Sequence, residues 1–89
     1  MAGFFGMNIE EVRSLSRQLQ EKSQQINQIA QQLTSQLSGT DWKGPDAERF
    51  RSEWDSTHRA ALQRVCDALQ NASQNASRNA DQQEQASGN

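Results

Sequence analysis

The sequence has few of the residues that catalytic and metal sites need. Its 89 residues include one cysteine, one histidine and no tyrosine. A single cysteine excludes an internal disulfide framework and a zinc site made of several cysteines. One histidine leaves few groups for general acid–base chemistry, and no serine or threonine stands in a visible arrangement with histidine and an acid. We therefore expect neither an enzyme nor a protein that binds a metal or a cofactor.

Excess positive charge and long apolar runs are also absent. Nine lysine and arginine residues against eleven acids give a net charge of −2, so the basic surface of a nucleic-acid-binding protein is missing. No stretch approaches the roughly 18 consecutive apolar residues that mark a membrane-spanning helix. The polar faces carry glutamine more than lysine or arginine, and we expect no binding to anionic membranes. The first seven residues have neither the basic start nor the apolar run of a cleavable secretory signal.

Helix-breaking residues are confined to a few places. Glycine occurs at positions 3, 6, 39, 44 and 88, and the only proline is Pro45. Two long segments therefore contain no breaker, and the break between them has glycine where a helix ends and proline where the next one begins. We predict one domain over 1–89, with a first helix over about 8–38, a turn at 39–45, a second helix over about 46–80 and a flexible polar tail at 81–89.

Both predicted helices carry apolar residues at helical spacing. In the first, Asn8 and Glu11 form a capping signature. Apolar residues then repeat every seven positions, with a second row three positions further on that Lys22 and Gln36 interrupt. In the second, a stripe begins with bulky residues and continues to Ala68 and Ala72, with leucines beside it. The predicted hairpin and dimer interface consists of Val12, Leu15, Leu19, Ile26, Ile29, Leu33, Phe50, Trp54, Ala61 and Val65.

The length of the chain indicates that one hairpin does not complete a core. A short turn makes neighbouring helices antiparallel, but two helices alone leave the flanks of each stripe exposed to water. Small scaffolds without disulfides or metals are usually stabilised by oligomerisation. We therefore predict an all-α fold, an antiparallel helical hairpin that dimerises into an elongated four-helix bundle. The apolar stripes fit either a second copy or another chain.

The predicted turn holds the motif Trp42-Lys43-Gly44. The motif lies in the only internal break of a predicted 89-residue helical hairpin with a polar tail. In this combination the chain resembles the WXG family, the early-secreted-antigen-like substrates of type VII secretion systems. The resemblance covers the whole chain. It implies a homodimer or a heterodimer with a paralogous WXG-type chain, synthesis in the cytoplasm, secretion without a cleavable signal peptide, and recognition by the hexameric ATPase of the secretion machine. It also points to a Gram-positive or actinobacterial source.

The second motif of that family is matched only in part. It is a Tyr-X-X-X-Asp/Glu that follows the second helix and contributes to export recognition. Asp81 can stand at its acidic position, which places Ser77 where the tyrosine would be, whereas Glu84 would pair with Ala80. The resemblance thus implies an export signal made of Ser77 and Asp81 together with the turn. Because the chain has no tyrosine, the alternative is a partner that carries the full signal.

Two functions are compatible with these features. The first is a small secreted WXG-type protein, a substrate or co-secretion adaptor of a type VII system, that acts by protein–protein recognition. The second is a cytoplasmic helical adaptor whose apolar stripe binds a helical segment of a larger protein. In the second case Trp42 only packs on the end of the hairpin, whereas in the first the turn also forms part of a recognised surface. His58 is expected to be a polar interface residue, and Cys66 a small buried one.

Overall fold

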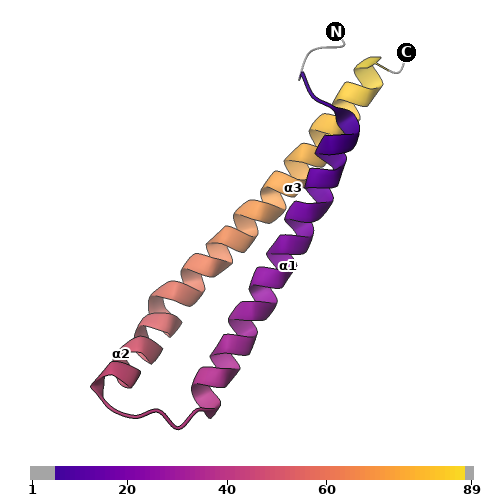
Figure 1. Cartoon of the computed structure of the whole chain (residues 1–89). Coiled ribbons are helices and arrows are strands. Elements are labelled where there is room, and N and C mark those ends of the chain that lie inside the picture. The colour runs from indigo at the N-terminus through magenta and orange to yellow at the C-terminus, as the bar shows by residue number, and fades with distance from the viewer. Residues whose placement is uncertain (1–5, 88–89) are drawn as a thin grey trace.

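The chain forms an all-α helical hairpin, as predicted. The structure, a computed structural model, describes residues 6–87; the very start of the chain, and residues 88–89 of the predicted tail, lie outside this range. Helix α1 (Ile9–Gly39) is the first arm, and α2 (Pro45–Glu53), the π-helical segment η1 (Trp54–His58) and α3 (Arg59–Ser87) form the second. The two arms run antiparallel along a rod of 66 × 17 × 12 Å (Figure 1).

Local signals set the ends of the helices. The Asn8 side chain caps α1 by accepting a hydrogen bond from the backbone N–H of Glu11 at 3.0 Å. Pro45 occupies the first turn of α2, followed by Asp46 and Glu48, whose negative charges suit a helix N-terminus. Helix α3 continues to Ser87, past the predicted end near residue 80, because the alanines, glutamines and glutamate of this segment are good helix formers.

The arms meet along two rows of side chains on each helix. One row of α1 is large and half-buried: Val12, Leu19, Ile26 and Leu33. The other row of α1 is small and buried: Ser16, Ser23 and Ala30. The facing rows of α3 have the same character, with Leu62, Leu69 and Ala76 half-buried and Cys66, Ser73 and Ala80 buried. The small residues allow the two backbones to approach closely enough for side chains of one helix to reach carbonyls of the other.

Two reciprocal polar contacts result from this close approach. The Ser16 hydroxyl donates to the carbonyl of Ser73 at 2.8 Å, and the Ser73 hydroxyl donates to the carbonyl of Ser16 at 2.7 Å. Likewise, the Ser23 hydroxyl donates to the carbonyl of Cys66 at 3.1 Å, and the Cys66 thiol donates to the carbonyl of Ser23 at 3.3 Å. Because a buried donor without a partner is costly, these contacts fix the register of the two helices.

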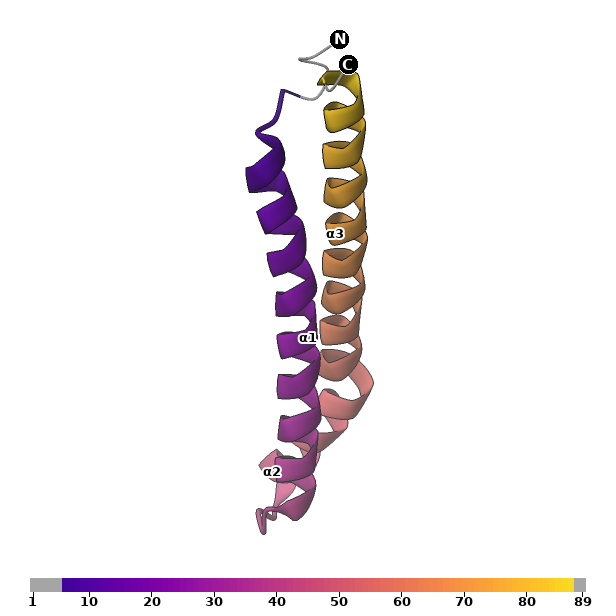
Figure 2. The same ribbon diagram turned by 90° about the vertical axis from the view of Figure 1, so that its right-hand side faces the viewer.

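The π-helical segment changes which residues of α3 face α1. A π turn accommodates one residue more than an α turn, so every position after η1 is shifted by one relative to a regular helix. The predicted stripe ran through Val65, Ala68 and Ala72, whereas the structure turns Cys66, Leu69 and Ser73 inward. Val65 is 44% exposed, while Ala61 stays half-buried. At the same place the second arm bends across α1 (Figure 2).

Two residues of the predicted α1 stripe do not contribute to the hairpin core. Leu15 is 50% exposed and Ile29 is 58% exposed, because the hairpin buries the row of small residues one position further along the chain instead. Their assignment to a dimer interface stays a prediction. None of the helices in residues 6–87 is long and apolar enough to cross a membrane.

Candidate functional site

The backbone of the corner requires glycine. Gly44 has φ = 115°, in the region that L side chains rarely adopt. Its carbonyl accepts a hydrogen bond from the N–H of Glu48 at 3.0 Å, and α2 begins at the next residue, Pro45. No atom lies within 4 Å of the position that a Cβ would take on Gly44, so the requirement comes from the dihedral angle and not from crowding. The glycine of the Trp-Lys-Gly motif therefore serves the turn itself.

Arg51 of α2 holds the corner together. Its guanidinium donates to the carbonyl of Leu37 through Nε at 3.0 Å and Nη2 at 2.9 Å. It also donates to the carbonyls of Thr40, at 2.9 Å, and Trp42, at 2.6 Å. The last carbonyls of a helix lack partners within the helix and carry its negative dipole end. Since the last turn of α1 contains no basic residue, Arg51 supplies this positive charge from the next helix.

Trp42 lies on the outside of the hairpin. It is 41% exposed, and the Arg51 guanidinium carbon lies 5.7 Å from the centre of its ring, within the range of a cation–π contact. The ring centres of Trp42 and Phe50 are 6.3 Å apart, as are those of Phe50 and His58. The three rings form an aromatic row from Trp42 in the connection before α2, over Phe50 of α2, to His58 of η1. Trp42 presents part of its ring to solvent.

Replacing Arg51 with methionine should loosen the corner. Methionine keeps an apolar stem but removes every hydrogen bond to the three carbonyls, and we expect a loss of about 2 kcal/mol in the free energy of unfolding. The matched control is Arg49→Met, since Arg49 is exposed and forms a surface ion pair with Asp46 at 3.3 Å. This change should cost about 0.5 kcal/mol or less. Urea unfolding followed by circular dichroism checks both values, and equal losses would contradict the role assigned to Arg51.

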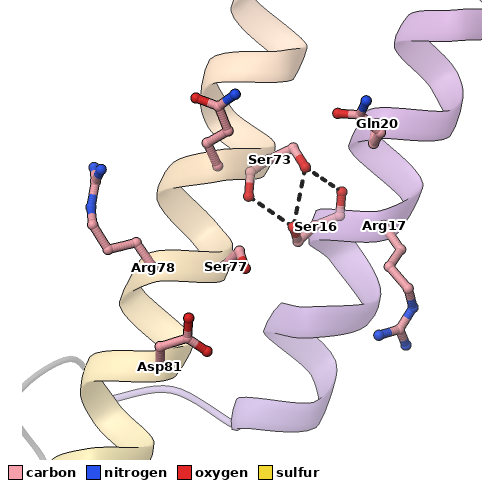
Figure 3. Close-up of a pocket in the computed structure, with 8 residues that line it drawn as sticks. Ser16, Arg17, Gln20, Ser73, Ser77, Arg78 and Asp81 are labelled. Atoms are coloured by element: carbon pink, nitrogen blue, oxygen red, sulfur yellow. Dashed lines mark hydrogen bonds between the residues drawn. The ribbon is translucent and has the colours of Figure 1, made fainter.

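The tail residues lie at the other end of the rod. Ser77 and Asp81 are exposed in the last turns of α3, whereas Trp42 and Gly44 lie in the connection between α1 and α2. Figure 1 shows that the last turns of α3 and this connection are at opposite ends of the rod. Ser77 opens on a groove of about 560 Å³ between the arms, lined also by Arg17, Arg78 and Asp81. Figure 3 shows these side chains beside the Ser16–Ser73 contact. One chain therefore does not bring the turn and the predicted tail signal together.

Arg13 of α1 binds the acidic residues of the tail. Its Nη2 atom donates to Asp81 Oδ1 at 3.0 Å and to Glu84 Oε1 at 2.9 Å, and its Nη1 atom donates to Glu84 Oε2 at 3.3 Å. Hydrogen bonds to Glu84 and then to Asp81 raise the pKa of Arg13. In turn, the hydrogen bond from Arg13 and the charge of its guanidinium lower the pKa of Glu84. These atoms form one charge network across the open end of the hairpin.

The Glu84 contact should be lost in acid. Because the pKa of Glu84 in the folded chain lies below its ordinary value of 4.5, the contact contributes fully above pH 4.5 and disappears as the pH falls through the lowered pKa. We expect the carboxyl carbon of Glu84 to titrate below 4.5 in an NMR experiment and to return toward that value in Arg13→Gln. A Glu84 midpoint that Arg13→Gln leaves unchanged would contradict this prediction.

Cys66 and His58 have surroundings that are typical of structural residues. Cys66 is 3% exposed, and His58 faces outward with its Nε2 atom 3.9 Å from a carboxyl oxygen of Glu53. Within residues 6–87, histidine, cysteine and acids form no group of three that could hold a metal ion. Arg13 and Arg51 were not predicted from the sequence. A signal for Arg51 was available, because a cation shortly after the turn is the nearest partner for the C-terminus of a helix that lacks one.

The comparisons with known proteins give one finding. The family model WXG100, described as proteins of 100 residues with WXG, matches residues 5–87. No curated protein and no solved structure matches the chain.

Proposed function

The chain belongs to the WXG100 family, and we propose that it is a small secreted protein that a type VII secretion system exports, as a substrate or as a co-secretion adaptor. It would act by protein–protein recognition and not by catalysis. The observation that carries this proposal is the match over residues 5–87, together with a Trp-Lys-Gly corner whose tryptophan is 41% exposed at the end of the hairpin. A ring that only completed the core would be buried.

An exposed apolar side supports pairing with a second chain. Leu15 and Ile29 each follow a residue of the large α1 row by three positions, and Val65 follows Leu62 by three. A residue three positions after a member of the row lies about 60° to one side of the row. A residue one position after a member lies about 100° to the other side. When two antiparallel helices face one another, residues with the same offset from the two facing rows lie on the same side of the hairpin. Leu15, Ile29 and Val65 thus lie on one exposed side, called here the apolar side, which Lys22 interrupts between Leu15 and Ile29.

The contact between Arg13 and Glu84 is consistent with a separate polar side, formed by residues one position after the rows that face the other helix. Arg13 follows Val12 by one position, and Glu84 follows the buried Gln83 by one; their side chains meet across the hairpin. The Ser77–Asp81–Glu84 region therefore belongs to the polar side, opposite the apolar side. Pairing through the apolar side would leave the predicted tail signal accessible.

The aromatic row joins the corner to the apolar side. His58 precedes Val65 by two helical turns, so the rings of Trp42, Phe50 and His58 continue into this side. An antiparallel pairing of two hairpins would then bring the corner of one chain to the same end of the dimer as the tail of the other. We propose that this composite of Trp42 and Gly44 from one chain with Ser77 and Asp81 from its partner is what the hexameric ATPase recognises. The partner is a second copy or a paralogous WXG-type chain.

Export of point variants from a host with the secretion system tests the proposal. Asp81→Asn should lower the amount of protein in the culture medium several-fold, and Trp42→Ala should do the same while the purified chain keeps its helicity. The matched control is Asp67→Asn, since Asp67 is exposed on the same helix and contacts Gln63 at 3.1 Å. Normal export of Asp81→Asn would overturn the tail assignment. A wild-type chain that stays in the cells would favour the cytoplasmic adaptor.

The solution mass of the purified chain tests the partner. Light scattering after size exclusion at micromolar concentrations should give twice the mass of 10.0 kDa if the partner is a second copy. Replacing Ile29 with glutamine should shift that species to a monomer, because it replaces a large exposed apolar residue of this side with a polar one. A wild-type monomer would exclude the homodimer and leave a paralogous chain as the partner.

A further inference from the structure

The open end of the hairpin has little apolar packing. Beyond Leu69, the apolar residues of α3 are all alanines, and the buried surface of an alanine is small. Ser16 and Ser73 form the last reciprocal contact before this end, and Ala80 is the last buried apolar residue of α3. Segments with few apolar contacts are the first to open locally. Apolar burial therefore contributes little to the order of residues 77–87.

The Arg13 contact is suited to supply that order. Asp81 and Glu84 are three residues apart, so their carboxylates share one face of α3. A single planar guanidinium binds both, and its fork geometry constrains position more than a point charge would. The contact joins α1 near its start to the last turns of α3, beyond the final reciprocal serine pair.

We infer that Arg13 is a positioning residue, which holds residues 77–87 as an ordered helix on α1 and presents Ser77, Asp81 and Glu84 on one side. The Arg13 side chain is 26% exposed, whereas those of Asp81 and Glu84 are each 60% exposed. The carboxylates thus remain accessible to a partner while the arginine is largely covered, so the contact orders the acids and does not hide them. The biological purpose of this order rests on the proposed export function.

Amide hydrogen exchange on the full-length chain tests the inference. Arg13→Gln should make residues 77–87 exchange several-fold faster and leave residues 59–70 unchanged. Arg17→Gln is the matched control, because Arg17 is an exposed arginine of the same helix that lines the adjoining groove; its exchange should equal that of the wild type. High salt should accelerate exchange of residues 77–87 in the wild type and not in Arg13→Gln, because screening removes only a contact between charges.

A charge swap separates the ion pair from packing. In Arg13→Glu combined with Glu84→Arg, the new arginine can bind both the new glutamate and Asp81, so protection of residues 77–87 should return to within about twofold of wild type. Arg13→Glu alone should lose more protection than Arg13→Gln, because it places three acids together. Equal exchange in Arg13→Gln and Arg17→Gln would overturn the inference, as would a swap variant that stays unprotected.

The result of the amide exchange experiments does not depend on the secretion system. If exchange changes as expected while Asp81→Asn is exported normally, Arg13 orders the tail but the tail is not the export signal. If exchange is unaffected while Asp81→Asn blocks export, the signal stands and the positioning role fails. Export of Arg13→Gln should fall and that of the charge-swap variant should recover in part when both assignments hold.

Discussion

Replacing Trp54 with alanine should lower the free energy of unfolding by about 3–5 kcal/mol, the range for removal of a buried aromatic ring. Trp54 is 6% exposed, and it is the only aromatic residue buried among residues 6–87. Its Nε1 atom also donates to the hydroxyl of Thr34 at 2.9 Å. Small domains are stable by only about 5–15 kcal/mol, so this single change should remove a large part of the stability of the hairpin.

Trp42→Ala provides the contrast for this experiment. Because Trp42 is 41% exposed and contacts one ring and one guanidinium, its removal should cost about 1 kcal/mol. Trp54→Phe should fall between the two alanine variants, since it keeps a ring but loses the hydrogen bond to Thr34. Urea unfolding at one fixed protein concentration compares them, because association with a second chain would couple stability to concentration. Equal losses for the two alanine variants would show that the corner tryptophan also supports the core.

The features of the fold that could be predicted are those encoded locally. The positions of glycine and proline located the corner, and the Asn8–Glu11 signature located the start of α1, because breaking and capping depend on neighbouring residues. The even spacing of apolar residues likewise indicated two helices. The tail was the exception: its polar composition led to an early predicted end of the second helix, although alanine and glutamine favour helix even where little packs against them.

The register of the second arm could not be predicted in this way. Residues 54–58 form η1 without any glycine or proline, so the one-residue shift has no local marker. The prediction extended a regular helix from Trp54 and reached Val65 where the structure places Cys66. The information lies in the pairing of the two arms. Ser16 and Ser23 are seven residues apart, as are Cys66 and Ser73, and only when these small pairs are matched does the register become evident.

For the same reason, only part of the candidate site could be predicted from the sequence. The Trp-Lys-Gly motif identified the corner because its residues are contiguous. The two arginines that organise the ends of the hairpin act across the chain: Arg51 binds carbonyls on α1 and in the loop, and Arg13 binds acids on α3. Pairing over such distances in sequence depends on the register, which the sequence pattern did not provide. Arginines on a polar surface otherwise resemble any solvated charge.

Deleting one residue from η1 should leave the rest of the hairpin in place. Trp54 and Leu62 both face α1 and are eight residues apart, one more than two regular helical turns allow. Deletion of Thr57, which is exposed and whose hydroxyl lies 3.4 Å from that of Ser56, should convert η1 to α-helix while Leu62, Cys66 and Ser73 keep their partners. We expect the free energy of unfolding to stay within about 1 kcal/mol of the wild-type value.

The same deletion outside η1 should be severe. Removing the exposed Gln70 rotates the rest of α3 by about 100°, which separates Ser73 from Ser16 and turns Ala76 and Ala80 away from α1. The loss should reach about 3 kcal/mol or more, because packing and a buried polar contact fail together. Urea unfolding measures both deletions, and the reactivity of Cys66 toward a thiol reagent reports the register. Cys66 should stay protected without Thr57, as expected of a residue that is 3% exposed in the intact chain. A reactive Cys66 in that variant would mean that the π turn determines the register of the hairpin instead of accommodating it.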